Sequence, residues 1–169
     1  MGRKSTKKEK NVYQKCREDA GLSREQASDL MNAVPDYKLV RIEDGTEPTP
    51  YEVTQMAQAY GKPELCNYHC SHMCEIGKKY VPQVAVSELP SIVLQTVAKL
   101  NEIYPWINRF IQISSDGKIS EDEFDDFIRI SSMLDEVSLA ADSLNLWIEK
   151  TFKENGMNEL ILEKKKTIK

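Results

Sequence analysis

The sequence predicts an all-α protein in which a domain of five short helices is followed by a long antiparallel helical hairpin. Two observations lead to this prediction. Apolar residues recur at steps of three and four in both halves of the chain, which is the spacing of one helix face. Ser, Thr, Gly and Pro stand where helices start and stop. With 169 residues, 40% of them hydrophobic, the chain is long enough for two small cores.

We expect five segments: a basic arm at 1–10, the five-helix domain at 11–76, a linker at 77–86, the hairpin at 87–155 and a tail at 156–169. The formal net charge of −4 argues against a protein that coats nucleic acid without selectivity. No apolar run approaches the roughly 18 residues that span a bilayer, and no signal core follows the charged start. The expectation is a cytoplasmic protein whose thiols stay reduced.

Local signals define the first two helices of the domain. The first helix is expected at 11–20 and ends before Gly21. Ser23 and Gln26 form a capping box that opens a second helix, which continues for about eight residues. The side chains expected to face inward are Tyr13, Cys16 and Ala20 in the first helix and Ala27, Leu30 and Met31 in the second.

Proline and glycine delimit the third and fourth helices. Pro35 disfavours a helical conformation before it, so the third helix starts there or at the next residue, and Gly45 lies just past its end. Thr49 and Glu52 form a further capping box, and the fourth helix that they open ends at Gly61. The expected inner faces are Leu39 and Ile42 in the third helix and Val53, Met56, Ala57 and Tyr60 in the fourth.

Three motifs in residues 11–65 resemble the phage-repressor or Cro-like family of bacterial helix-turn-helix regulators, also called the xenobiotic-response-element family. They are R-x-x-x-G-L-[ST]-x-x-x-A from Arg17, R-I-E-x-G from Arg41, and P-x-P-x-x-V-x-x-M-A-x-x-Y. The resemblance implies a repressor-like domain in which Arg17 and Glu43 form a structural ion pair. The chain departs from the family at Arg24, where Gln is usual, and its turn is one residue longer.

The resemblance predicts a sequence-specific transcriptional regulator that binds double-stranded DNA as a dimer, with the third helix in the major groove. Outward positions on the second and third helices would meet the DNA. The expected DNA-binding residues are Ser23, Arg24, Asp36, Tyr37, Lys38 and Arg41. We expect base contacts from Tyr37, Lys38 and Arg41, and phosphate contacts from Ser23 and Arg24.

The charge balance supports an alternative. Residues 11–80 hold 8 Lys or Arg against 11 Asp or Glu, so the helix-turn-helix could serve as the scaffold of a protein-interaction adaptor. We expect no enzyme activity, because the sequence shows no nucleophile with a paired base, no glycine-rich phosphate loop and no carboxylate dyad.

Three cysteines and both histidines fall within residues 66–74. Thiolate and imidazole are ligands of zinc and iron-sulfur clusters, and a helix that breaks near Ser71 would let the cysteines converge. The candidate ligands are Cys66, Cys70, Cys74 and, from the first helix, Cys16. The spacing is not that of a zinc ribbon or a ferredoxin, and cysteine is readily buried. Structural thiols are therefore the alternative to a metal or redox-sensing site.

Two apolar stripes at helical spacing predict the hairpin. The first stripe is Leu89, Val93, Val97, Leu100, Tyr104, Ile107 and Ile111, and the second is Phe124, Phe127, Met133 or Leu134, Val137, Ala141, Leu144 and Ile148. Pro105 should kink the first helix or divide it. Two antiparallel helices bury too little alone, so 87–155 is expected to pair with a second copy into a four-helix bundle or to bind another protein.

The connection between the two stripes resembles the second half of a calcium-binding EF-hand loop, from Asp116 to Glu123. Its first half lacks the required carboxylates, because Gln112 and Ser114 occupy the opening ligand positions. The simpler interpretation is a turn followed by a helix that Ser120 and Glu123 cap.

Overall fold

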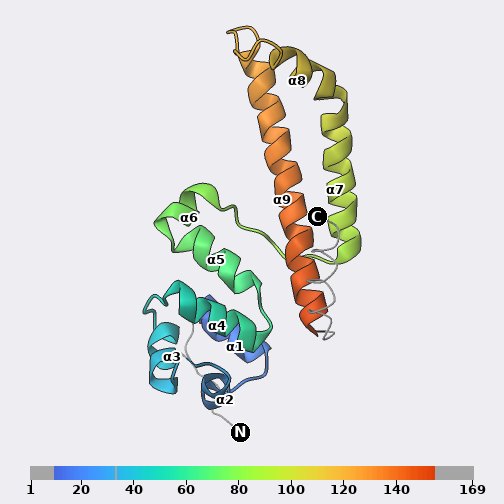
Figure 1. Ribbon diagram of the computed structural model, residues 1–169. Coiled ribbons are helices and arrows are strands. Elements are labelled where there is room, and N and C mark those ends of the chain that lie inside the picture. Colours follow the sequence, from blue (N-terminus) through green and yellow to red (C-terminus); the bar gives the residue numbers. More distant parts are fainter. Residues whose placement is uncertain (1–9, 33, 155–169) are drawn as a thin grey trace. The chain divides into compact units, whose positions relative to one another are not determined.

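The computed structural model describes residues 10–32 and 34–154, and this part of the chain is helical with no strand (Figure 1). It divides into two compact units, Met1–Val84 with Glu149–Lys169, and Ala85–Ile148. Most of the basic arm and the tail expected at 156–169 lie outside the described residues. No helix in the described ranges is both long enough and apolar enough to cross a membrane.

The first unit contains α1 (Val12–Asp19), α2 (Arg24–Asp29), α3 (Asp36–Glu43), α4 (Pro50–Tyr60), α5 (Glu64–His72) and α6 (Glu75–Tyr80). The expected helix signals are confirmed. Both capping boxes are formed, Ser23 with Gln26 and Thr49 with Glu52. Gly61 ends α4 in the left-handed conformation, with φ of 66°.

The core of this unit is built from residues of all five helices α1 to α5 and of the segment between α2 and α3. Its buried residues are Tyr13, Ala27, Met31, Val34, Leu39, Ile42, Val53, Met56, Ala57, Tyr60 and Leu65. The inner faces expected for the third and fourth helices are confirmed. The second helix was expected to run to about Met31, but α2 ends at Asp29. Leu30, its C-cap, was expected to face inward and is 60% exposed, whereas Met31 is buried as expected. Cys16 and Ala20 are only partly buried against this core.

A sixth helix, α6, occupies part of the region 77–86 that was expected to be a linker. Cys74 caps its start, and the Cys74 Sγ accepts a bond from the Gly77 N–H at 3.4 Å. A Cβ at Gly77 would lie 2.0 Å from the backbone oxygen of Cys70, so the missing side chain lets α6 pack on the end of α5. The Asn67 side chain then bonds, at 3.0 and 2.8 Å, to the extended backbone that follows α6.

The second unit is a helical hairpin. It consists of α7 (Leu89–Ile103), the 3-10 turn η1 (Tyr104–Trp106), α8 (Ile107–Ile113) and most of α9 (Phe124–Glu154), which lies beside α7 and α8 (Figure 1). Pro105 lies in η1 and separates α7 from α8, as its position in the sequence predicted. The Ser120 hydroxyl bonds to the Glu123 carboxylate at 2.5 Å just before α9 begins.

Candidate nucleic-acid interface

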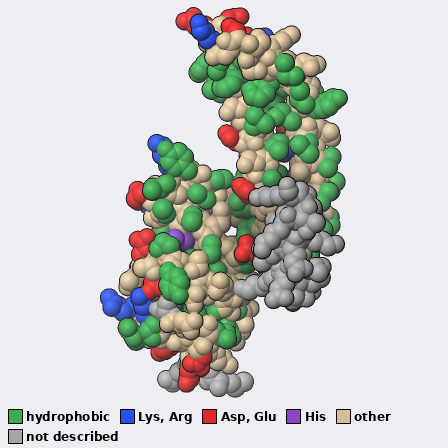
Figure 2. All heavy atoms as spheres, viewed as in Figure 1, with side chains coloured by type: hydrophobic (Ala, Val, Ile, Leu, Met, Phe, Trp, Pro, Cys, Tyr) green, Lys and Arg blue, Asp and Glu red, His purple; other side chains and the backbone are tan. Residues whose placement is uncertain are grey.

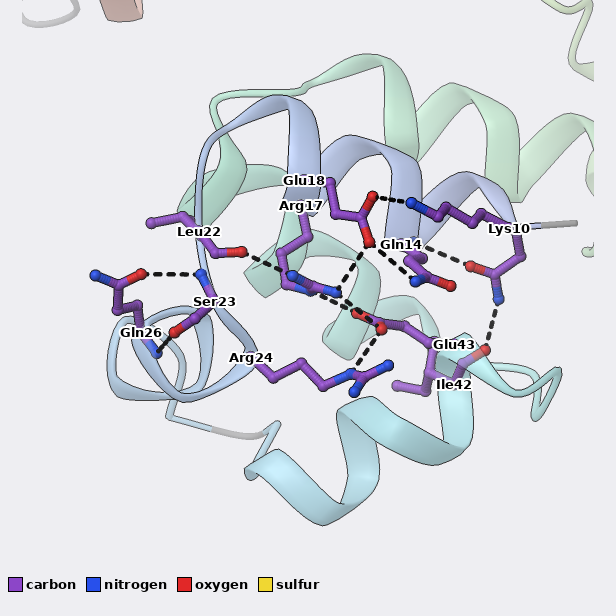
Figure 3. A network of polar contacts seen from close by, with 11 residues as sticks. Lys10, Gln14, Arg17, Glu18, Leu22, Ser23, Arg24, Gln26, Ile42 and Glu43 are labelled. Carbon is purple, nitrogen blue, oxygen red and sulfur yellow. Dashed lines mark hydrogen bonds and ion pairs between the residues drawn. The ribbon is translucent and has the colours of Figure 1, made fainter. Parts of the chain in front are cut away.

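Glu43, the last residue of α3, is the centre of a buried ion cluster (Figure 3). Its carboxylate accepts bonds from Arg17 Nε at 2.6 Å and from Arg17 Nη2 at 3.0 Å. Arg24 Nε donates a third bond at 2.8 Å. Arg17 and Glu43 are 6% and 4% exposed. The structure therefore contains the ion pair that the family resemblance implies, and it adds Arg24 to that pair.

Arg17 connects three parts of the unit from inside. Besides its bonds to Glu43 it donates from Nη1 to the Leu22 carbonyl at 2.7 Å, in the loop before α2. Burial alone would lower the pKa of this guanidinium, but the hydrogen bonds and the charge of Glu43 outweigh burial and raise the pKa. Arg17 therefore stays charged and fixes the position of the end of α3.

Asn11 is a second anchor of α3 that the sequence analysis missed. Its side-chain oxygen caps α1 by accepting from the Gln14 N–H at 3.0 Å, and its amide nitrogen donates to the Ile42 carbonyl at 2.7 Å. An Asn just before a helix is a recognisable N-cap signal. Its contact with α3, 31 residues away, has no local signal.

Arg24 lies at the junction of α2 and α3, with 35% of its side chain exposed. Glu43 occupies only its Nε, and an arginine has four further N–H donors on its two terminal nitrogens. Ser23 is next to it, and its hydroxyl oxygen accepts from the Gln26 N–H at 3.1 Å, which leaves the hydroxyl hydrogen able to donate. Both residues that were expected at phosphate thus keep donors at the start of α2.

The outer face of α3 presents Tyr37 and Arg41. Tyr37 is 68% exposed and Arg41 is also exposed, while Leu39 and Ile42 on the inner face are 0% and 1% exposed. Tyr37 and Arg41 are four residues apart, so they lie on the same side of the helix. Asp36, in the first turn, is exposed too, and its carboxylate can accept a bond from a cytosine amino group but repels phosphate.

Lys38 lies outward, with 42% of its side chain exposed, but its ammonium is not free. Its ammonium forms an ion pair with Glu52 of α4, which is 4% exposed. Burial would raise the pKa of Glu52, but the bonds from Lys38 and from Thr49 outweigh burial and lower it. The charge of Lys38 is therefore compensated within the fold. The sequence could not reveal this pair, because its partners lie on different helices.

The cysteines serve as partly buried or capping thiols. Cys66 and Cys70 lie one turn apart on α5, and Cys74 caps α6. Among the residues that the structure describes, no three His, Cys, Asp or Glu side chains are grouped so that they could hold a metal ion. Burial, and then the charge of Glu64, raises the pKa of Cys16 to about 11, so Cys16 is a thiol at neutral pH.

His69 also has a structural environment. It is 4% exposed on α5, and its Nδ1 lies 3.3 Å from the Tyr13 hydroxyl of α1. Burial raises the pKa of Tyr13, so the phenol stays protonated and can donate a hydrogen bond to the imidazole. On the same helix, the rings of Tyr68 and His72 stack at 4.4 Å. His69 thus links α1 to α5, whereas the contacts of His72 with Tyr68 and Ser71 lie within α5.

No protein-family model matches this chain, and no curated protein or solved structure matches it. The resemblance to repressor-like domains therefore depends on the sequence motifs alone. The geometry of α2 and α3 is the basis for the function proposed below.

Proposed function

We propose that the first unit binds double-stranded DNA as the reading domain of a transcriptional regulator. The observation that carries this proposal is the presentation of α3: Tyr37 and Arg41 are exposed on its outer face, while the ion pair between Arg17 and Glu43 fixes its end from inside. In helix-turn-helix proteins the second of two successive short helices lies in the major groove, and an exposed polar face on α3 supports the same role here.

The exposed residues divide into two roles. Arg41 can donate two parallel bonds to the O6 and N7 atoms of guanine, and Tyr37 can contact a base edge with its hydroxyl or a thymine methyl group with its ring. Arg24 and Ser23, at the start of α2, can donate to phosphate and so set the position of the unit on the duplex. The carboxylate of Glu43 holds the Arg24 side chain at that position before DNA arrives.

A titration of the full chain against a random-sequence duplex tests this proposal. Fluorescence anisotropy should show binding at low salt and a steep loss of affinity as salt rises, with a slope of about −0.9 in log K per phosphate contact. Arg24→Gln should make that slope shallower by about 1. Arg41→Ala should weaken binding to a selected sequence by about 1–3 kcal/mol. Lys118→Gln removes an exposed cation of the second unit and is the matched control.

The result that would overturn DNA binding is a folded wild-type protein that does not bind at low salt. Binding that Arg24→Gln and Arg41→Ala leave unchanged would overturn the proposed reading face. If the wild type binds DNA through Arg24 and Arg41, sequence selection from a random duplex pool should identify the operator.

A protein-interaction adaptor is the second candidate, and the charge balance of the unit favours it. Lys38 is neutralised by Glu52, and residues 11–80 hold 8 Lys or Arg against 11 Asp or Glu. In this alternative the exposed ring of Tyr37 would contact a protein, and the unit would show no salt-dependent affinity for DNA. The titration above separates the two candidates.

A further inference from the structure

The outer face of α7 and α8 carries a continuous apolar stripe. Six large side chains at steps of three and four are between 44% and 75% exposed: Val93, Val97, Leu100, Tyr104, Ile107 and Ile111. We call these six residues the α7–α8 stripe. Hydrophobic side chains are numerous on the face of the hairpin that Figure 2 shows. Single exposed apolar residues are ordinary on a protein surface, but a row of this length indicates a contact surface.

The hairpin buries few residues of its own. Ile92 is the only buried residue in the 15 residues of α7. Ile113 of α8 and Ile130 and Ala140 of α9 are the other buried apolar residues in the described part of 87–154. Two helices with so small a shared core have little hydrophobic stabilisation. The hairpin therefore needs further apolar contacts, and a surface that covers the α7–α8 stripe would supply them.

The charges of α7 and α8 indicate what kind of surface fits. These helices hold three charged residues, Lys99, Glu102 and Arg109. Each is in an ion pair within the hairpin: Lys99 lies 3.1 Å from Glu102 and 2.6 Å from Glu136, and Arg109 lies 2.7 Å from Asp126. No charge is left over on these helices to be matched by a partner of opposite sign.

The α7–α8 stripe itself contains no charged residue. Lys99 is two residues from Val97, which places it ~200° around the helix. In a two-fold contact, a charged residue close to the axis meets its own copy and is repelled by it. An uncharged stripe has no such repulsion. A helix that lies on a membrane surface has Lys or Arg along its polar face, and α7 and α8 have no such row.

The length of the stripe agrees with the area that a dimer needs. The elements α7, η1 and α8, of 15, 3 and 7 residues, extend ~38 Å at about 1.5 Å per residue. Together with α9 beside them, they form a face about two helix diameters, or ~20 Å, wide. That footprint of ~750 Å² is close to the roughly 800 Å² that each partner buries in a stable interface.

We propose that a second copy of this chain covers the α7–α8 stripe, so that two hairpins pack face to face into a four-helix bundle. The proposal narrows the pairing expected for 87–155 to one face of the hairpin. It does not depend on whether the first unit binds DNA. If the first unit also binds DNA, the dimer supplies two copies of α3 for the two half-sites of a two-fold operator.

The mass of the full chain in solution, measured by sedimentation equilibrium without DNA, tests the proposal. The wild type should have twice the 19.4 kDa chain mass at micromolar concentration. Val97→Glu and Tyr104→Glu should each raise the dimer dissociation constant by at least ~30-fold, because each places a charge in the buried centre of the contact. Both positions are exposed in the single chain, so far-UV circular dichroism should remain unchanged.

Ile128→Glu is the matched control. Ile128 is 50% exposed, close to the 49% of Val97, but it lies on α9 two residues from the buried Ile130 and so ~200° around the helix, away from the hairpin core. This variant should remain a dimer. A wild type that is monomeric at every concentration would overturn the proposal and leave the stripe to another occupant. Dimers that persist in both stripe variants, or that Ile128→Glu disrupts equally, would overturn it as well.

Discussion

Glu43→Gln should destabilise the first unit severely. The substitution removes the only carboxylate that Arg17 and Arg24 share and leaves the guanidinium of Arg17, which is 6% exposed, with Glu18 at 3.9 Å as its remaining counter-charge. Loss of one partner of a buried ion pair costs about 3–5 kcal/mol. Arg17 keeps its bond to the Leu22 carbonyl, and a glutamine retains one acceptor oxygen. We therefore expect the lower end of this range, about 3 kcal/mol, or ~12–24 °C in melting temperature for a domain of this size.

Urea denaturation followed by two signals measures this effect in the full chain. Far-UV circular dichroism reports helix in both units, whereas the fluorescence of Trp106 and Trp147 reports the second unit alone and serves as an internal reference. The dichroism midpoint of the first unit should fall by ~1–3 M urea. Glu25→Gln, exposed on α2, should stay within ~0.5 kcal/mol of the wild type.

A double variant separates the loss of a pair from the loss of an acidic residue. Replacing both partners, Arg17→Met with Glu43→Leu, removes the unpaired charge and should recover most of the stability. A Glu43→Gln variant within ~0.5 kcal/mol of the wild type, or a double variant less stable than the single one, would contradict the stabilising role of this ion pair.

Three further predictions concern the rest of the unit. Gly77→Ala should speed amide hydrogen exchange in α5 and α6, because the new methyl would lie 2.0 Å from the Cys70 carbonyl oxygen; unchanged exchange would contradict the packing. Glu52 has a lowered pKa, so the stability that its contacts with Lys38 and Thr49 add is present at neutral pH and lost as the pH falls through that pKa. The stability difference between wild type and Glu52→Gln should accordingly shrink between pH 7 and pH 3, and a constant difference would disprove the link. Cys16, with a pKa of about 11, should react with iodoacetamide far more slowly at pH 7 than free cysteine does, with a rate that rises about tenfold per pH unit.

Short-range chemistry made much of the first unit predictable. The capping boxes at Ser23 and Thr49 depend on a side chain and a backbone N–H three residues apart, so the sequence contains the whole interaction. The same holds for Gly61, whose positive φ favours a residue without Cβ. The helix starts and the inner faces of α3 and α4 follow from such signals and from the helical period.

Long-range contacts were the part that the sequence could not supply. Periodicity identified Val97 and Tyr104 as members of one apolar stripe, but it could not show that Ile92, on another side of the same helix, packs in the hairpin core while the stripe is exposed. A helical period gives the composition of each face, whereas the partner of a face depends on the other elements present. The ion pair of Lys38 could not be predicted for a related reason, since Glu52, its buried partner, lies on another helix.

The ion cluster at Glu43 connects the stability of the unit with its proposed reading face. Three cations, Lys10, Arg17 and Arg24, share two carboxylates there, Glu18 and Glu43, so the network keeps one net positive charge. The pair of Lys38 and Glu52 is neutral by contrast. A phosphate that bonds to the terminal nitrogens of Arg24 would add the missing negative charge without displacing Glu43, because Arg17 alone supplies two bonds to that carboxylate. The buried pair can thus remain intact while the exposed arginine binds a ligand. This arrangement places an attraction for an anion beside the exposed face of α3.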